Sequence, residues 1–348
     1  MRKQRKCDKM KFSVIIPVYN CADRLHISVE SIFQQTYGDF ELILVNDGST
    51  DNSLDICNEY ASKDCRVKVL NQKNSGPSVA RNTGLKYVSG EYVVFCDADD
   101  CLEKEALEKI IKEIRNNDDK CDIVFYGYYD SAMENGSIIK RNKHTYNHSV
   151  FNSNTALKEK YNDLNNISFT YPVWNKAYRL QFVKESKAEF PVGVNIAEDY
   201  IFNLKLYTKA ERTIVMSEWL YNYIQHSGSI TTKFQESKIN SAEYVYEYAV
   251  KVMEKWNPNM VNCIHNAYLK DISVYINNMF NSNVDLSVTK KIELVRSVIR
   301  KESVRICIKD VKCSSFRNKM ICMLIKYRMA LLLLLTGKIA RLKCRKKC

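Results

Sequence analysis

Apolar and polar stretches alternate along the first 130 residues, and their lengths predict strands and helices in turn. Short β-branched and aromatic runs predict strands at residues 12–17, 40–45, 67–70, 92–96 and 122–128. Between them, the spacing of apolar positions predicts helices at residues 25–33, 54–60, 78–87 and 102–115. Strands that alternate with helices in this way indicate an α/β fold with a mostly parallel, doubly wound, Rossmann-like sheet.

The alternation fades after residue 130. Residues 130–170 are polar and rich in asparagine, which predicts a loop region over the edge of the sheet or over an active site. From residue 237 to residue 335 the apolar pattern is mainly helical. The chain has 348 residues, which is enough for a catalytic domain and a helical C-terminal extension.

Three carboxylates follow the predicted strand at residues 92–96: Asp97, Asp99 and Asp100. Ligands of open α/β sheets bind outside the carboxyl ends of the strands, and Asp97 and Asp99 lie on one face of an extended segment. Because like charges repel, this cluster favours a cation between the carboxylates, and hard divalent cations prefer oxygen ligands. The alternative is a solvated loop or a helix N-cap, with Asp100 capping the helix predicted from Leu102.

The net charge of +13 is concentrated at the two ends of the chain. Residues 1–11 carry +5 and residues 316–348 carry +10, which leaves about −2 for the rest. The thirteen cysteines are odd in number and form no Cys-x-x-Cys pair, so we expect free thiols in a reducing, cytoplasmic setting. The charged N-terminus reaches only a short apolar strand, and we expect no signal peptide.

The basic C-terminal segment leaves two interpretations open. Its uninterrupted apolar run, residues 329–335, is far shorter than a membrane-spanning helix needs, and Lys326 and Arg328 interrupt anything longer. A basic amphipathic helix on anionic lipid is one interpretation, and a helix packed on the catalytic domain is the other. Nucleic-acid binding is not expected, because the segment lacks interleaved aromatic residues and any recognised binding module.

Four motifs in order carry a family resemblance. They are Ser13-Val14-Ile15-Ile16-Pro17-Val18-Tyr19-Asn20, Val45-Asn46-Asp47-Gly48-Ser49-Thr50-Asp51, Gly76-Pro77-Ser78-Val79-Ala80-Arg81-Asn82-Thr83-Gly84 and Asp97-Ala98-Asp99-Asp100. Together they resemble the signature of family 2 glycosyltransferases, which are GT-A fold enzymes that use nucleotide-sugar donors. The resemblance implies Mn²⁺ or Mg²⁺ as the cofactor.

The resemblance also implies roles for single residues in the donor site. The residues expected to bind the donor are Pro17, Val18, Tyr19, Asn20, Asp47, Arg81, Asp97 and Ala98. Of these, Asp47 matches the base-contacting aspartate and Arg81 would reach the diphosphate, where a guanidinium offers bidentate contacts. Asp97 would lie by the ribose and the metal, and Asp99 would be the main metal ligand. The alternatives are a surface arginine for Arg81 and a simple Asp-Gly turn for Asp47.

Residues 195–202 resemble the family's Glu-Asp segment, in which the aspartate is usually the catalytic base. Asp199 would then accept the proton of the acceptor hydroxyl as that hydroxyl attacks the anomeric carbon, and Glu198 would contact substrate. One displacement of this kind inverts the anomeric centre. The alternative is that Glu198 and Asp199 are an acidic pair favoured at a helix N-terminus. This alternative and the catalytic role of Asp199 are compatible with each other.

Two further segments look like family segments. In the first, Trp174 would stack on a sugar face and Lys176 would contact donor or acceptor oxygens; the alternative is a core tryptophan and a solvated lysine. In the second, His226 is a candidate for metal or phosphate contact, with a surface histidine as the alternative. The Gln-x-x-Arg-Trp motif of processive synthases is absent, so we expect single-residue transfer.

These observations predict a metal-dependent inverting glycosyltransferase that moves a hexosyl or N-acetylhexosaminyl group. We expect the donor to be a nucleotide sugar, specifically a UDP-sugar. We expect the acceptor to be a glycan or lipid-linked glycan of a bacterial surface polysaccharide. The enzyme would work in the cytoplasm, peripherally at the inner face of the cell membrane. We expect four parts: a basic segment (1–11), a nucleotide-sugar-binding half (12–130), an acceptor-binding half (131–236) and a helical region with a basic amphipathic tail (237–348).

Two rival functions stay open at this point. A nucleotidyltransferase would need a Gly-rich, basic phosphate loop after the first strand, and residues 17–23 do not form one. A degenerate, non-catalytic member that binds sugar nucleotides would explain the same motifs, although the intact Asp97, Asp99 and Asp199 argue against it.

Overall fold

The computed structural model describes residues 10–117, 120–134, 137–194, 196–225, 234–281 and 284–345. These residues form two compact units. The first contains the described residues up to Gly193 and those from Glu198 to residue 225, and the second contains the remainder of the described chain.

The first unit is built on one sheet. Within the described residues its strands follow the order β3-β2-β1-β4-β9-β6-β10-β5, with β7 beside β6 and β8 beside β10. The strands are β1 (Phe12–Val18), β2 (Phe40–Asp47), β3 (Val67–Gln72), β4 (Tyr92–Phe95), β5 (Cys101–Leu102), β6 (Ile123–Glu134), β7 (Ser137–His144), β8 (Ser149–Phe151), β9 (Lys176–Arg179) and β10 (Thr213–Gln225).

The sheet is mixed rather than mostly parallel, which corrects the prediction. Strands β1 to β4 run parallel to one another, and parallel neighbours need crossover connections, here through helices. The short strand β9 then enters antiparallel between β4 and β6, and β6 is parallel to β10. Because β9 has four residues and a buried Ala177–Tyr178 pair, its pattern is too short to be read from the sequence.

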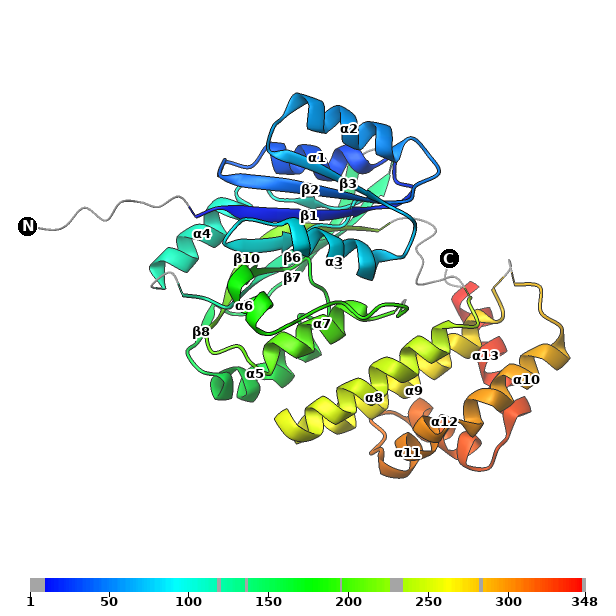
Figure 1. Ribbon diagram of the computed structural model, residues 1–348. Helices are drawn as coiled ribbons and strands as arrows, with labels where there is room; N and C mark the ends of the chain where they lie inside the picture. The colour runs from blue at the N-terminus through cyan, green and yellow to red at the C-terminus, as the bar shows by residue number, and fades with distance from the viewer. Residues whose placement is uncertain are drawn as a thin grey trace, which may run out of the picture. The chain divides into compact units, whose positions relative to one another are not determined.

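Helices pack against this sheet (Figure 1). They are α1 (Leu25–Phe33), α2 (Ser53–Lys63), α3 (Pro77–Tyr87), α4 (Ala106–Asn116), α5 (Asn154–Asn166), α6 (Leu180–Glu185) and α7 (Glu198–Tyr207). The first three predicted helices are confirmed within three residues at each end. The fourth begins later than predicted, because Cys101 and Leu102 pair with β10 as β5 before the chain becomes helical at Ala106.

The predicted loop over residues 130–170 is wrong. Strand β6 continues to Glu134, and β7, β8 and α5 follow. The polar composition belongs to an edge strand, β7, whose described pairing is with β6; edge strands are commonly charged. Helix α5 starts at a regular N-cap, where the Ser153 hydroxyl accepts a hydrogen bond from the Ala156 amide at 3.2 Å.

The helical prediction for residues 237–335 is confirmed. The second unit consists of α8 (Lys238–Trp256), the 3-10 helix η2 (Pro258–Met260), α9 (Val261–Asn278), α10 (Val288–Arg300), α11 (Glu302–Asp310), α12 (Phe316–Lys326) and α13 (Ala330–Arg345). Helix α9 packs against α8, α11, α12 and α13. In the part of the chain that the structure describes, no helix combines the length and the apolar character required to cross a bilayer.

Candidate active site

The carboxyl ends of β1 and β2 bring two predicted donor-binding segments together. The side-chain oxygen of Asn20 accepts a hydrogen bond from the Thr50 amide at 2.8 Å, and the Asn20 amide donates to the Ser49 hydroxyl at 3.1 Å. Tyr19 is 49% exposed beside them. Gly48 has φ +67°, and a Cβ there would lie 2.5 Å from the backbone nitrogen of Asn74, so only glycine fits this close approach.

Asp47 anchors the loop that leads into α3. Its Oδ1 accepts from Nε2 of Gln72 at 2.7 Å and from the Ser75 amide at 2.9 Å, and its Oδ2 accepts from the Gly76 amide at 2.8 Å. The residue is buried. Both carboxylate oxygens are therefore used within the chain, and a nucleoside base would share or displace these hydrogen bonds.

The three carboxylates after β4 have different surroundings. Asp100 is buried and accepts hydrogen bonds from the Tyr221 hydroxyl and the Ile224 amide, both at 2.7 Å. Burial, reinforced by the negative charges of Asp97 and Asp99, raises the pKa of Asp100 well above its usual range. Asp100 thus ties β4 to β10. The N-cap alternative is wrong, because Glu105 precedes α4 at that position.

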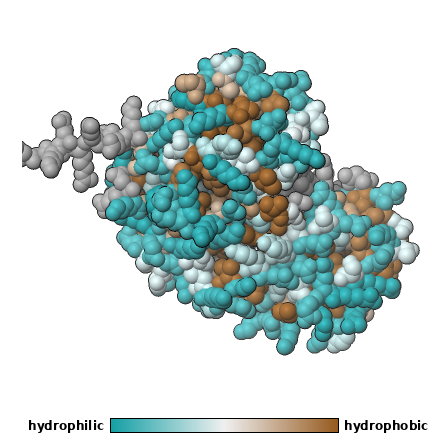
Figure 2. All heavy atoms as spheres, viewed as in Figure 1, coloured by the Kyte–Doolittle hydropathy of each residue, from teal (hydrophilic) through white to brown (hydrophobic). Residues whose placement is uncertain are grey.

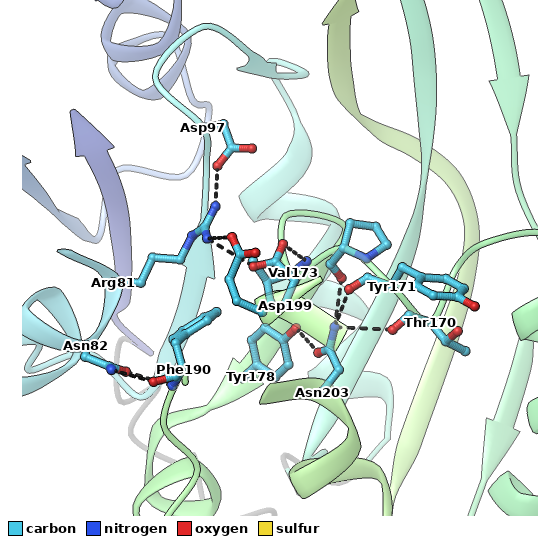
Figure 3. A network of polar contacts seen from close by, with 12 residues as sticks. Arg81, Asn82, Asp97, Thr170, Tyr171, Val173, Tyr178, Phe190, Asp199 and Asn203 are labelled. Carbon is cyan, nitrogen blue, oxygen red and sulfur yellow. Dashed lines mark hydrogen bonds and ion pairs between the residues drawn. The ribbon is translucent and has the colours of Figure 1, made fainter. Parts of the chain in front are cut away.

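Arg81, on α3, connects the acidic cluster to the predicted base (Figure 3). Its Nη2 lies 2.9 Å from Oδ1 of Asp97, and its Nη1 lies 3.1 Å from Oε1 of Glu198 and 3.0 Å from Oδ1 of Asp199. The Arg81 side chain is only 6% exposed. Burial acts to lower the pKa of Arg81, but the three carboxylates outweigh it and raise that pKa above its ordinary value.

Asp199 lies in the first turn of α7, where a helix N-terminus favours a negative charge. Its Oδ2 accepts a hydrogen bond from the Val173 amide at 3.3 Å, and its side chain is 18% exposed. Burial raises the pKa of Asp199 to about 7; Arg81 opposes the rise, and Glu198 and Asp97 add to it. A carboxylate with this pKa is suited to accept a proton near neutral pH.

The loop that supplies the Val173 amide is held by side chains from three elements. Nδ2 of Asn203, on α7, donates to the carbonyl oxygens of Tyr171 and Pro172, and the Tyr178 hydroxyl on β9 donates to Oδ1 of Asn203 at 2.6 Å (Figure 3). The Tyr126 hydroxyl on β6 donates to the Trp174 carbonyl oxygen at 2.8 Å. The loop is fixed by these hydrogen bonds rather than by regular secondary structure.

Lys176 belongs to the same arrangement. It is fully buried, and its Nζ donates to the carbonyl oxygens of Phe169 at 2.7 Å and Pro172 at 2.5 Å and to Oδ1 of Asn175 at 2.6 Å. These three hydrogen bonds use its three N–H groups, so no donor is left for a substrate oxygen in this arrangement. The solvated lysine of the alternative does not describe this position, and a contact of Lys176 with donor or acceptor oxygens would need at least one of these hydrogen bonds to break.

Trp174 lies in an aromatic cluster and is 9% exposed. Its ring stacks on Tyr221 at 4.5 Å and on Tyr223 at 5.7 Å, and it meets Tyr128 edge-on at 4.8 Å. This is the arrangement of a core tryptophan, and stacking on a sugar would need rearrangement of the cluster. His226 lies outside the described residues.

Two described carboxylates after β4, Asp97 and Asp99, are the candidates for holding a metal ion. Among them, no group of three histidine, cysteine, aspartate or glutamate side chains is arranged to hold a metal ion. Asp97 is 30% exposed, and Asp99 is partly exposed two residues later. A divalent cation that keeps waters and binds substrate phosphates needs only one or two carboxylates, so Asp97 and Asp99 fit a cation that is shared with the donor.

Sequence reasoning did not identify the residues that position the site. Three residues position the site without contacting a substrate. Val173 does so through its backbone amide, and Asn203 and Tyr221 through hydrogen bonds to other residues of the chain. A motif that is considered residue by residue does not indicate such contacts. Burial of a polar residue inside an apolar run, as for Asn203 within α7, is the signal that could have found one of them.

Comparisons with known proteins agree with the motifs. The family described as "Glycosyl transferase family 2" matches residues 13–186, which is half of the chain. The chain is 33% identical to the uncharacterized glycosyltransferase EpsJ of Bacillus subtilis over 63% of this chain and 62% of EpsJ. It is 32% identical to the poly(ribitol-phosphate) beta-glucosyltransferase of Bacillus spizizenii over 62% of this chain and 32% of that protein. The chain thus spans less than two thirds of the length of these relatives.

A solved structure shows the same fold. The crystal structure of Staphylococcus aureus TarS 1–349 in complex with UDP-GlcNAc superimposes with a TM-score of 0.65 at 22% identity, over 97% of this chain and 92% of that chain. This likeness confirms the predicted GT-A α/β fold with its helical C-terminal region. The ordered motifs, the half-chain family match and the shared fold together establish that this chain belongs to glycosyl transferase family 2.

Proposed function

We propose that the chain is a metal-dependent, inverting glycosyltransferase that moves one sugar from a nucleotide sugar to a hydroxyl group of a glycan or lipid-linked glycan. The observation that carries this proposal is the Arg81 network, in which one buried guanidinium holds the donor-side carboxylate of Asp97 and the carboxylate of Asp199. A donor bound at Asp97 and an acceptor bound at Asp199 would lie within the length of one side chain of each other.

The reaction follows from the position and the pKa of Asp199. The Asp199 carboxylate accepts the proton of the acceptor hydroxyl while that oxygen forms a bond to the anomeric carbon. The bond from the anomeric carbon to the donor phosphate breaks on the opposite face, and its electron pair leaves with the nucleoside diphosphate. The amide of Val173 and the guanidinium of Arg81 keep the Asp199 carboxylate oriented during this step.

The leaving diphosphate needs positive charge. We propose that Asp97 and Asp99 hold a Mn²⁺ or Mg²⁺ ion, with His226 as a further candidate ligand. When bound, such an ion neutralises the charge that grows on the leaving phosphate. Of the residues assigned to the donor by resemblance, Pro17, Val18, Tyr19, Asn20 and Ala98 stay proposed donor contacts, and Glu198 stays a proposed substrate contact.

The proposed donor is a UDP-sugar, and the proposed acceptor is part of a bacterial surface polysaccharide. The shared fold with TarS, whose structure contains UDP-GlcNAc, supports the first assignment. The similarity to a poly(ribitol-phosphate) beta-glucosyltransferase supports the second. We place the reaction at the cytoplasmic face of the cell membrane, where a lipid-linked acceptor would be reached by a peripheral enzyme.

A donor screen tests the proposal. Isothermal titration of the purified chain with UDP-, GDP- and dTDP-sugars in the presence of Mn²⁺ should show binding of a UDP-sugar that EDTA abolishes. The bound donor should then be hydrolysed slowly or transferred to an acceptor extract, and Asp199→Asn should bind the donor without turnover. Binding without turnover in the unsubstituted chain would instead indicate a non-catalytic family member, and no binding to the folded chain would refute the donor site.

A further inference from the structure

The last two helices of the second unit each carry two apolar faces. On α12, the buried face consists of Ile321, Leu324 and Ile325. A second line of apolar residues recurs at helical spacing beside this face: Phe316, Met320 and Met323 on α12 and Tyr327 at its C-cap. Phe316 is 83% exposed, Met323 51% and Tyr327 67%. Helix α12 therefore packs through one face and leaves the other in solvent.

Helix α13 repeats this arrangement. Leu333 and Leu334 are buried, and Gly337 lies so close to α9 that a Cβ there would be 2.8 Å from Cγ2 of Ile276. This close approach fixes the buried face of α13. The other side exposes four aliphatic residues, which are Leu331 (57%), Leu332 (41%), Leu335 (51%) and Ile339 (53%). They occupy one side of the helix, about 100° wide.

We call these eight residues, Phe316, Met320, Met323, Tyr327, Leu331, Leu332, Leu335 and Ile339, the second apolar face. The face visible in Figure 2 is largely hydrophilic, with hydrophobic residues in separate groups. Against such a surface, eight apolar residues on two consecutive helices are unusual, because exposed apolar residues of a water-soluble surface are normally scattered singly. The second apolar face needs an occupant.

The charge of the residues around the second apolar face indicates which kind of partner covers it. Residues 316–348 contain ten lysines and arginines and no acidic residue. Lys326 on α12, Lys338 on α13 and Arg328 between the two helices are exposed next to apolar residues. An apolar helix face with flanking lysines and arginines, and without enough length to span, is the pattern of a helix that lies in the interface of an anionic bilayer.

We propose that α12 and α13 form a docking surface for an anionic lipid bilayer, with the second apolar face inserted below the head groups and the basic residues at their level. A second copy of the chain is a poorer occupant, because it would bring an equal positive charge. A nucleic acid would satisfy the charge but not the aliphatic side chains of α13. This proposal does not depend on the transfer reaction.

Vesicle binding tests the proposal without substrate. The full chain is sedimented with vesicles of phosphatidylcholine alone or with about 30% phosphatidylglycerol, and we expect binding to the second kind only. The double variant Leu331→Ser/Leu335→Ser should weaken that binding by about tenfold or more, since each buried leucine contributes on this scale. Lys326→Gln/Lys338→Gln should weaken it roughly fivefold per lysine.

Matched controls come from α10 in the same unit. Val288 is 66% exposed, so Val288→Ser should bind as the unsubstituted chain does, and so should Lys290→Gln. Insertion is checked separately by the fluorescence of Leu335→Trp, which should shift to the blue on anionic vesicles, whereas Val288→Trp should not shift. Equal binding of all variants, or no shift at residue 335, would overturn the proposal. Light scattering could instead show that the chain is a dimer and that Leu331→Ser/Leu335→Ser dissociates it; this result would favour a second copy as the occupant. If the chain binds RNA but no vesicles, and Lys326→Gln/Lys338→Gln abolishes the RNA binding, the occupant is a nucleic acid. Either result would overturn the proposal.

Discussion

Nη1 of Arg81 lies 3.0 Å from Oδ1 of Asp199, although the two residues are 118 positions apart in the chain. The same guanidinium contacts Asp97 through Nη2. The charge of Asp199 is therefore balanced by a residue that also contacts Asp97, in the proposed donor site. This relationship makes the protonation of Asp199 the most direct test of the proposed chemistry.

The rate of transfer should depend on the protonation of Asp199. Because its pKa is about 7 and the base must be unprotonated, kcat should rise with pH between about 6 and 8 and then level off. Asp199→Asn should lower kcat by about 10²–10⁴ and leave donor affinity within about twofold. The measurement is a pH–rate profile with saturating donor.

A control for this profile is Glu189→Gln, a change at an exposed acidic residue of the same unit that should leave the profile unchanged. A loss of donor affinity in Asp199→Asn, with kcat preserved, would contradict the assignment of the base.

Removal of Asp99 should abolish the metal dependence. Asp99→Asn is expected to lower activity at least about a hundredfold at a given Mn²⁺ concentration and to weaken the effect of EDTA on donor binding, because a carboxylate ligand is replaced by a neutral amide. Titration of activity and of donor binding against Mn²⁺ measures both effects. Asp23→Asn, at a side chain that is 71% exposed, is the matched control, and an Asp99→Asn enzyme with ordinary activity would remove Asp99 from the proposed site.

Replacement of Lys176 should act on stability and not on donor binding. In Lys176→Met the carbonyl oxygen of Phe169 loses its lysine partner, and we expect the free energy of unfolding to fall by about 2 kcal/mol. Urea denaturation measures this change, and isothermal titration at low temperature measures donor affinity of the folded variant.

The matched change Lys160→Met, at a residue that is 55% exposed on α5, should alter the free energy of unfolding by less than about 0.5 kcal/mol. A stable Lys176→Met variant that has lost donor affinity would support the prediction from the sequence that Lys176 contacts the substrate.

Glu41 should make the fold sensitive to acid. Burial alone would raise the pKa of Glu41, but hydrogen bonds from Lys68, Ser13 and Ser89 hold it at about 2. Since the folded-state pKa lies below the ordinary 4.5, the protein loses up to about 3 kcal/mol of stability as the pH falls from about 5 to about 2. Glu41→Gln should be less stable at pH 7 and lose less on acidification.

Thermal unfolding between pH 7 and pH 3 measures this difference. Glu59→Gln, at a 61% exposed residue of an i,i+4 pair, should follow the unsubstituted chain. An identical pH dependence in Glu41→Gln and the unsubstituted chain would show that other carboxylates control acid unfolding.

The sequence predicted the parts of the fold whose pattern is local. The helix at residues 25–33 has the observed bounds, and β1 differs from its prediction by one residue, because buried runs bounded by turn residues define them without tertiary information. Strand β9 and the antiparallel β5 were missed, since strands of four and two residues carry no periodicity. The edge strand β7 was predicted as a loop because its residues are polar, and polar residues are also what suits a strand to the edge of a sheet.

The site could be predicted in part. The motifs single out Asp97 and Asp199 as candidates, but no spacing along the chain indicates that Arg81 contacts both. The burial of Lys176 could not be predicted, because a lysine in a motif is ordinarily read as solvent-exposed or ligand-binding. Its three acceptors are oxygens of nearby residues, and two of them are backbone carbonyls, which every sequence has. Tertiary packing, rather than residue type, decides such roles.

Strand β10 is the last strand along the part of the chain that the structure describes, yet it lies inside the sheet, between β6 and β5. During synthesis the chain must therefore reach residue 225 before the sheet can be completed. Until then β6 and β5 present unpaired edges, and edges of this kind pair with other chains. Contacts that join such distant segments also form slowly. A chain that ended at residue 186, the last residue of the family match, would lack α7 and β10 and would be expected to aggregate rather than fold.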